Sequence, residues 1–265
     1  MDSSGEKAVR VGNAAGTSPF VLVCDHASNF IPARYGDLGL TPAERVSHIA
    51  WDPGALELTL ALSDKLGAPF VYSTVSRLLI DPNRAPDAVG AIWTLSEATR
   101  IAANENVGAA ERRYRVDTFH QPYHDAIETV LGARDAGGQK SILVCIHSFT
   151  PVYLGVERPW PIGLLHGVDP TYTAALRDAL ARGNPDLNIG WNEPYAALNG
   201  VTYTLEYHGD RRGLASTMIE MRNTEILDPG GIALWTERLA SALVEARDAL
   251  GEAPADGPVP AAGPA

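Results

Sequence analysis

The sequence has too few basic residues and too few long apolar runs for two large classes of protein. Lys and Arg number 21 against 32 Asp and Glu, and the net charge is -11. A nucleic-acid-binding face is basic, so this balance argues against a nucleic-acid partner. It does not exclude a small anionic substrate, because a few arginines within a site can bind an anion even when the net charge of the protein is negative. No apolar run approaches the roughly 18 residues of a membrane span, so no membrane partner is expected.

Cysteine is scarce, and an apolar leader is missing. The residues from Met1 to Lys7 contain no apolar signal region, which favours a cytoplasmic protein. Cys24 and Cys145 both lie in apolar runs. In a reducing compartment we expect them to be free buried thiols rather than a disulfide.

Two common catalytic motifs are also missing. The sequence has no Gly-x-Gly-x-x-Gly or Gly-x-x-x-x-Gly-Lys tract, so a phosphate-binding loop is not indicated. It has no Gly-x-Ser-x-Gly tract either, so a serine hydrolase built on Ser28 or Ser148 has little support.

The chain reads as one domain with polar ends. Residues 1–17 are small and polar and predict a loose, flexible arm, and residues 252–265 are rich in Ala, Pro and Gly and predict a disordered tail. Between them, residues 18–251 contain no linker or repeat, so they form a single predicted domain.

Apolar runs of strand length alternate with helical patterns in that domain. Strands are predicted over 19–24, 70–75, 142–149, 160–166, 201–207 and 217–221. Helices are predicted near 41–44 and over 52–66, 101–134 with an interruption at Gln121-Pro122, 170–182 and 231–250. This order predicts a three-layer α/β/α fold with a mixed, largely parallel central sheet.

Two of the predicted strands end in near copies of one pattern. Residues 21–28 and 142–149 are apolar runs that lead into Cys-x-His. Runs that are apolar on both faces are typical of central strands, whose carboxyl ends face the crevice in which open α/β sheets bind ligands. His26 and His147 are therefore candidates for a zinc or catalytic site, and a hydrogen-bonded structural role stays open. The cysteines two residues earlier are interpreted as packing residues.

Two acids could join the histidines. Asp52 precedes Pro53, where a helix N-cap is the favoured reading over a metal ligand. Glu220 lies between apolar residues at a predicted strand end, and burial would raise its pKa toward that of a useful general base. A salt bridge from Glu220 to Arg212 or Arg222 is the alternative.

A polar cluster follows the strand predicted over 70–75. Arg77 and Arg84 could clamp a substrate carboxylate, with Asn83 between them. A structural ion pair between Arg77 and Asp81 is equally compatible with the spacing. His124 and His208 are further titratable groups whose roles stay open.

Several of these motifs belong to a series of blocks that runs in order from about residue 19 to residue 245. The blocks are Cys24-Asp25-His26-Ala27-Ser28-Asn29-x-Ile31-Pro32, Trp51-Asp52-Pro53-Gly54, Ser76-Arg77 through Asp81-x-Asn83-Arg84, His120-x-Pro122-Tyr123-His124, Ile146-His147-Ser148-Phe149-Thr150-Pro151, Asn192-Glu193-Pro194-Tyr195, Tyr207-His208-Gly209 and Ile219-Glu220-Met221-Arg222-Asn223. The series resembles the N-formylglutamate amidohydrolase family.

The resemblance implies a zinc-dependent exopeptidase-like fold and a set of roles. Zinc would be held by His26, Asp52 and His147, and Glu220 would be the general base. The implied substrate contacts are Arg77, Asn83, Arg84, His208 and Arg222. The sequence departs from the related carboxypeptidases at Asn29, where they place a glutamate ligand.

The resemblance also implies the reaction. The expected activity is hydrolysis of the amide bond of an N-formyl amino acid, with N-formyl-L-glutamate as the leading substrate. Another N-acyl amino acid or small amide is the first alternative. A non-catalytic binding protein on the same fold is the second. The oligomeric state is left open.

Overall fold

The fold is built on a mixed sheet of seven strands. A computed structural model of the chain describes residues 7–195 and 200–252. The strands lie in the order β1-β3-β2-β6-β11-β9-β10. Neighbouring strands β3, β2, β6 and β11 are parallel, whereas β1 and β9 run antiparallel to β3 and β11. Their bounds are β1 Val9–Gly12, β2 Phe20–Cys24, β3 Phe70–Ser73, β6 Ile142–Phe149, β9 Ile162–Leu165, β10 Ile189–Trp191 and β11 Ala215–Arg222.

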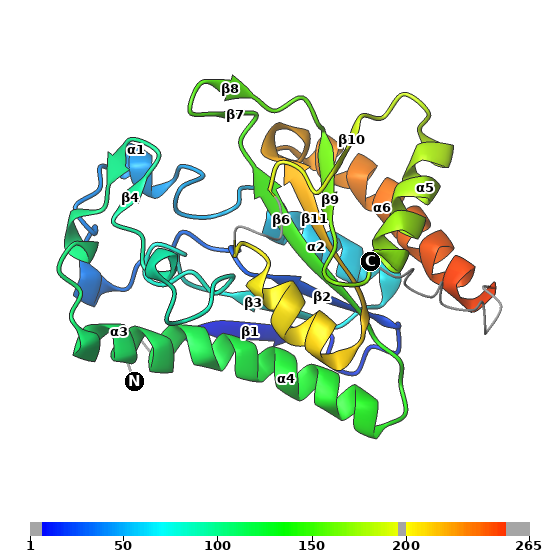
Figure 1. The fold of residues 1–265 in the computed structure, drawn as a ribbon, viewed down its shortest axis with the longest axis horizontal. Helices are drawn as coiled ribbons and strands as arrows, with labels where there is room; N and C mark the ends of the chain where they lie inside the picture. The colour runs from blue at the N-terminus through cyan, green and yellow to red at the C-terminus, as the bar shows by residue number, and fades with distance from the viewer. Residues whose placement is uncertain (1–6, 196–199, 253–265) are drawn as a thin grey trace, which may run out of the picture.

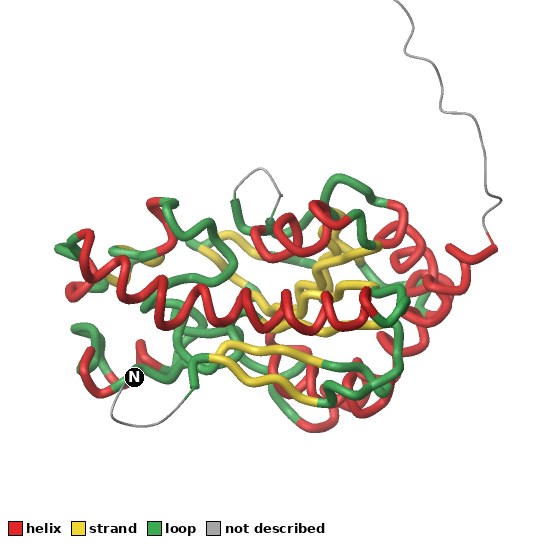
Figure 2. The backbone as a smooth tube through the Cα atoms, turned by 90° about the horizontal axis from the view of Figure 1, so that it is seen from below, coloured by secondary structure: helices red, strands yellow, loops and turns green. Residues whose placement is uncertain are grey.

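Helices cover both faces of this sheet. Figure 1 shows α2 (Ala55–Leu66), α5 (Thr171–Gly183) and α6 (Pro229–Glu252) on one side and the long helix α4 (Gln121–Ala136) on the other. Figure 2 shows the same chain from below, with the long helix α4 in front of the sheet. The three-layer α/β/α prediction is therefore confirmed.

The two strands that lead to the histidines are buried on both faces. Every residue of β2 and of β6 is buried. Phe20 and Leu22 pack in the core that includes Trp235 of α6, whereas Val21 and Val23 pack against α4. This alternation is the physical reason for an unbroken apolar run. It confirms the predicted central position of both strands.

A third apolar cluster supports the loops on one side of the sheet. It includes Leu38, Leu78, Ile80, Ile101 and Phe119. Short elements lie outside the main layers: α1 (Pro42–Arg45), α3 (Ala109–Arg115), and the hairpins formed by β4 (Leu95–Ser96) with β5 (Thr99–Arg100) and by β7 (Val152–Tyr153) with β8 (Val156–Glu157). None of the helices that the structure describes combines the length and the apolar character needed to cross a membrane.

Part of the expected flexible arm is ordered in the sheet. Residues 9–12 form β1, which pairs antiparallel with β3. The expectation of a loose arm is wrong there, because backbone hydrogen bonds to β3 order a short edge strand with little burial. Residues 1–6 and the predicted tail from 253 onward lie outside the described residues. The division into arm, one domain and tail stays a prediction.

The strand predicted over 201–207 is wrong. The backbone is helical from residue 203, and Leu205–Gly209 form a π-helical turn. Side chains impose this shape: the Thr204 amide donates to Asn83 Oδ1 (3.0 Å), and its hydroxyl donates to Asp25 Oδ1 (2.5 Å). Tertiary contacts outweigh the β-branched and aromatic pattern.

The helical stretch predicted over 101–134 is more divided than expected. A 3₁₀ turn at Ala102–Asn104 is separate from α3, and a π-helical turn at Val116–His120 joins α3 to α4. Pro122 lies in the first turn of α4 and has no N–H, so it donates no hydrogen bond to the π-helical turn that precedes it. The expected break is thus a local change in helix type.

Two glycines should respond oppositely to an added methyl group. A Cβ on Gly163 of β9 would lie 1.7 Å from the Glu193 carbonyl oxygen, whereas one on Gly132 of α4 would meet nothing within 4 Å. We expect Gly163→Ala to lower the free energy of unfolding by about 1–3 kcal/mol. Gly132→Ala should raise it by about 0.4–1 kcal/mol. Urea unfolding of both variants measures this, and equal effects would contradict it.

Candidate active site

Three ligand atoms converge where β2 and β6 end. His147 lies on β6, His26 follows β2, and Asp52 lies three residues before α2. Asp52 Oδ2 is 2.9 Å from His147 Nδ1 and 3.2 Å from His26 Nδ1, and the two Nδ1 atoms are 3.2 Å apart. All three side chains are buried. Two imidazole nitrogens and one carboxylate oxygen form a donor set typical of a catalytic zinc site.

Each histidine is fixed from behind by a second buried carboxylate. His26 Nε2 is 2.7 Å from Asp81 Oδ1, and His147 Nε2 is 2.8 Å from Asp25 Oδ2. An Nε2–H that donates to a carboxylate leaves the Nδ1 lone pair directed into the site, which is the arrangement common around protein-bound metals. The donor chemistry therefore fits a divalent cation.

Sequence reasoning did not find the role of Asp25. Its signal is its position: an ionisable residue directly after an apolar strand is fully buried here and needs a partner. Burial opposes its ionisation, but the hydrogen bond from His147 and the charges of both histidines hold its pKa below the ordinary value.

Asp52 serves the site and not the helix. Its backbone N–H donates to the His26 carbonyl (2.9 Å), and its Oδ2 accepts from the Ser148 backbone N–H (3.2 Å). Helix α2 is capped instead by Gly54, whose φ of 83° is left-handed. The favoured reading of Asp52 as a helix cap is thus wrong.

Glu220 lies beside the three ligand atoms with one oxygen unused. On β11 it is the register partner of His147 on β6. The side chain is buried, and Oε2 has no hydrogen-bond partner. Burial raises the pKa of Glu220 from 4.5 to about 7, against the lowering effect of His147. A buried carboxylate that still accepts a proton near neutral pH has the property of a general base.

The alternative salt bridges to Glu220 are not formed. Arg222 donates to Glu225 Oε1 (2.5 Å), and Arg212 pairs with Glu128. Arg222 therefore does not line the cavity beside Glu220, and its predicted contact with substrate has no support from its position.

Arg77 and Arg84 reach the site, and the Arg77–Asp81 ion pair is formed, whereas the clamp on a substrate carboxylate stays a prediction. Arg77 Nη2 donates to Asp81 Oδ2 (2.5 Å), while its Nη1 lies 3.1 Å from His26 Nδ1 and 3.6 Å from Asp52 Oδ1. Arg84 Nε lies 3.8 Å from Asp81 Oδ2, and the Arg84 Cζ lies over the Trp93 ring, 4.7 Å from its centroid. Both side chains line the cavity, so a structural ion pair and a substrate contact are compatible.

Two other predicted contacts have structural positions. Asn83 lines the cavity, but its Nδ2 donates to the Val201 carbonyl (2.5 Å) and its Oδ1 accepts from Thr204. His208 is fully buried and contacts His124, with 2.9 Å between His208 Nε2 and His124 Nδ1, and it does not line the cavity. A direct substrate role is therefore unsupported for both.

Three further motif residues, His120, His124 and Asn29, form hydrogen bonds to backbone carbonyls. His120 Nε2 lies 2.9 Å from the Arg84 carbonyl, and His124 Nε2 lies 2.9 Å from the Pro82 carbonyl. Burial lowers the pKa of His124 to about 3, so it stays neutral and donates one proton. These histidines thereby fix the loop that carries Asp81 and Arg84. Asn29 has a similar role, since its amide donates to the Arg45 carbonyl (3.1 Å).

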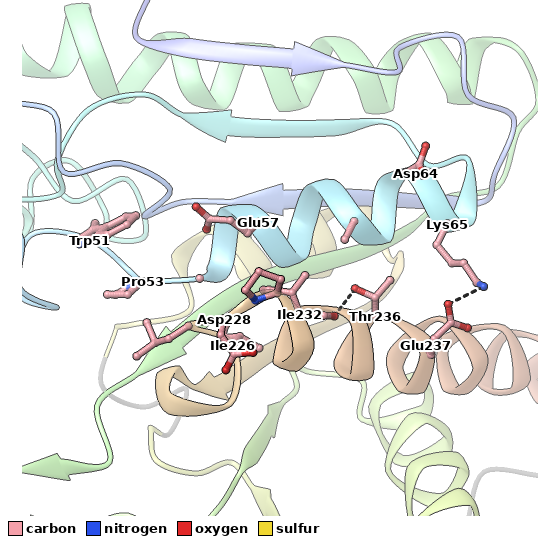
Figure 3. A pocket seen from close by; sticks show the side chains of 15 residues that line it. Trp51, Pro53, Glu57, Asp64, Lys65, Ile226, Asp228, Ile232, Thr236 and Glu237 are labelled. Carbon is pink, nitrogen blue, oxygen red and sulfur yellow. Dashed lines mark hydrogen bonds and ion pairs between the residues drawn. The ribbon is translucent and has the colours of Figure 1, made fainter.

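A cavity of about 440 Å³ opens over these groups. Its further walls come from the end of the β7–β8 hairpin and from the segment after β10, which contribute Tyr153, Arg158 and Tyr195. A larger cavity of about 720 Å³ lies between α2 and α6, walled by residues such as Pro53, Ile232 and Thr236 (Figure 3). It contains neither the histidines nor Glu220, so the chemistry belongs to the smaller cavity.

The cysteines beside the histidines are packing residues, as expected. Cys24 and Cys145 are free and fully buried. Burial raises the pKa of both thiols well above the ordinary value, so neither supplies a thiolate.

A sequence model of N-formylglutamate amidohydrolases matches residues 18–227. The chain belongs to the N-formylglutamate amidohydrolase family. The crystal structure of gene product Atu2144 from Agrobacterium tumefaciens shares 40% sequence identity with the chain, with a TM-score of 0.91 over 94% of this chain and 98% of that one. N-formylglutamate amidohydrolase from Ralstonia eutropha JMP134 is 21% identical, with a TM-score of 0.69 over 92% and 98% of the two chains. No curated protein matches the sequence.

Membership of the N-formylglutamate amidohydrolase family makes the protein an amidohydrolase and confirms the resemblance in the motifs. The Ralstonia structure supports the shared fold. The matched segment spans His26, Asp52, His147 and Glu220, so the candidate site lies within the family's part of the chain.

Glu220 should destabilise the metal-free protein in a pH-dependent manner. Since the folded state raises its pKa from 4.5 to about 7, the stability contributed by its protonated form is fully present below about pH 4.5 and lost as the pH rises through 7. At pH 8 we expect Glu220→Gln to raise the free energy of unfolding of chelator-treated protein, on the order of 3 kcal/mol. Near pH 5 the gain should fall below about 1 kcal/mol. Thermal unfolding at both pH values measures this, and a variant no more stable at pH 8 would contradict it.

Proposed function

We propose that the protein hydrolyses the amide bond of N-formyl-L-glutamate with one zinc ion, giving L-glutamate and formate. The observation that carries the proposal is the unpartnered Glu220 Oε2 beside the convergent His26, Asp52 and His147. A binding protein on the same fold would gain nothing from a buried acid held at a pKa of about 7. A strained or destabilised group of this kind is typical of a catalytic site.

His26, Asp52 and His147 would hold the zinc. When bound, zinc would act as a Lewis acid toward the amide carbonyl and would lower the pKa of a water molecule. Asp81 and Asp25 keep the two imidazoles in the tautomer that offers Nδ1. The chain's own part in metal binding is thus orientation by buried carboxylates.

Glu220 would transfer the proton. Its free Oε2 accepts a proton from the attacking water, and the same group delivers it to the amine nitrogen as the carbon–nitrogen bond breaks. Burial suits it to both steps, because a pKa near the working pH lets one carboxyl group accept and release a proton.

Arg77 and Arg84 would receive the anionic substrate. Arg77 adjoins the ligand atoms, with its Nη1 3.1 Å from His26 Nδ1. A guanidinium so close to the reacting carbonyl suits the α-carboxylate next to the scissile nitrogen or the developing oxyanion. Hydrolysis of another N-acyl amino acid would use the same groups, so the acyl preference has to be measured.

Removal of a ligand and removal of the base should have different effects. We expect His147→Ala to lose zinc, because two remaining donors hold it weakly. Glu220→Gln should keep zinc while turnover falls about 10²–10⁴-fold. Metal analysis and formate release from N-formyl-L-glutamate measure both. Full activity in metal-free protein would refute the zinc mechanism.

Asp25, whose carboxylate contacts His147, should contribute to the affinity for zinc. Asp25→Asn leaves the three ligands in place but weakens the orientation of His147, so we expect zinc to bind about 10–100-fold more weakly. The matched control is Asp117→Asn, since Asp117 is exposed and pairs with Arg113 far from the metal ligands. Competition with a chelator measures both affinities. An unchanged affinity in Asp25→Asn would show that the contact does not position the ligand.

The acyl group can be tested with matched substrates. N-formyl-L-glutamate and N-acetyl-L-glutamate differ by one methyl group, which a pocket distinguishes by about 10–200-fold at most. We expect the formyl compound to have the higher kcat/KM. A preference for the acetyl compound would favour the alternative substrate.

A further inference from the structure

Arg158 is a buried cation that the proposed mechanism does not use. It directly follows β8, and its backbone N–H donates to the Pro151 carbonyl (2.8 Å). The residue is 9% exposed, and its side chain lines the same cavity as Glu220. Its hairpin follows β6, whereas Arg77 and Arg84 follow β3, which lies two strands away in the sheet.

Aromatic rings hold its guanidinium. The Arg158 Cζ lies 4.6 Å from the ring centroid of Tyr153, 4.9 Å from that of Tyr195 and 5.7 Å from that of Phe149. Its Nη1 also donates to the Tyr195 hydroxyl (3.2 Å). Stacking of this kind orients a guanidinium without neutralising its charge.

The charge balance separates Arg158 from the other two arginines of the cavity. Arg77 and Arg84 both approach Asp81, so their charges have a protein counter-ion. No carboxylate in residues 7–195 and 200–252 forms an ion pair with Arg158, whose one side-chain hydrogen bond is to a neutral phenol. A buried cation without a counter-ion is costly. An anionic group in the cavity would remove that cost.

We propose that Arg158 and Tyr195 form the subsite that binds the side-chain carboxylate of the substrate and so set the preference for an acidic side chain. The inference rests on the proposed function. Arg77 is the arginine next to the proposed metal ligands and suits the α-carboxylate, whose carbon is three bonds from the scissile carbonyl carbon. Arg158 reaches the cavity from the segment after β8 and has no carboxylate partner in the described part of the chain, so we assign the second carboxylate to it. Two separate cationic positions match a dicarboxylate and not a neutral amino acid.

The test compares N-formyl-L-glutamate with N-formyl-L-glutamine, which has the same shape and a neutral side chain. We expect the wild type to prefer the glutamate compound in kcat/KM by about 30–100-fold, as for a charge-assisted hydrogen-bonded pair. In Arg158→Gln, kcat/KM for the glutamate compound should fall by most of that factor. The value for the glutamine compound should change less than about threefold. Arg158→Lys, which keeps the charge without the fork, should be intermediate. Arg113→Gln, at an exposed ion pair on α3, is the matched control.

Three results would overturn the subsite. They are a wild type without preference for the glutamate compound, an Arg158→Gln variant that keeps the preference, and equal losses on both compounds. The first needs no variant, so the subsite can be overturned even if Arg158→Gln does not fold, and Arg158→Lys then tests the assignment to Arg158.

A wild type that hydrolyses neither compound refutes the proposed function instead. The subsite is then tested by thermal shift with L-glutamate and L-glutamine. Stabilisation by glutamate alone that weakens in Arg158→Lys and disappears in Arg158→Gln supports the subsite, and its absence in the wild type refutes it.

Discussion

The site depends on the balance of charge around three buried aspartates. Asp25, Asp52 and Asp81 lie out of water, where ionisation is costly. His26 and His147 nevertheless hold the pKa of Asp25 and Asp52 below the ordinary value, and Arg77 with His26 does so for Asp81. Glu220 is the exception, because the nearby cations only partly offset the rise in its pKa that burial causes. The same polar interior thus keeps three carboxylates ionised for binding and leaves one ready to accept a proton. This division of roles depends on position and not on residue type.

The sheet supplies the precision that this balance needs. Parallel strands β2, β6 and β11 are neighbours, so their carboxyl ends bring His26, His147 and Glu220 to one edge. The register places Glu220 directly beside His147. Helices on both faces keep these strands in place through buried contacts. Loops then add what the strands cannot, because the arginines and Asp81 come from segments fixed by side-chain hydrogen bonds.

The strands that carry the site could be predicted from the sequence, but the residues that orient its side chains could not. Strands β2 and β6 were recognisable because burial on both faces produces an unbroken apolar run. The family motifs then indicated Asp52 and Glu220. Local patterns could not show that Asp25 orients His147, since that contact joins residues 122 positions apart. Arg158 was missed for the same reason: its aromatic partners meet only in the fold.

The contacts of Thr204 link the two halves of the candidate metal site. Its amide bonds to Asn83, two residues after the aspartate that supports His26, and its hydroxyl bonds to Asp25, which supports His147. The supports of the two imidazoles therefore meet at one residue. A disturbance of the turn at Thr204 would reach the segments that support both candidate nitrogen donors.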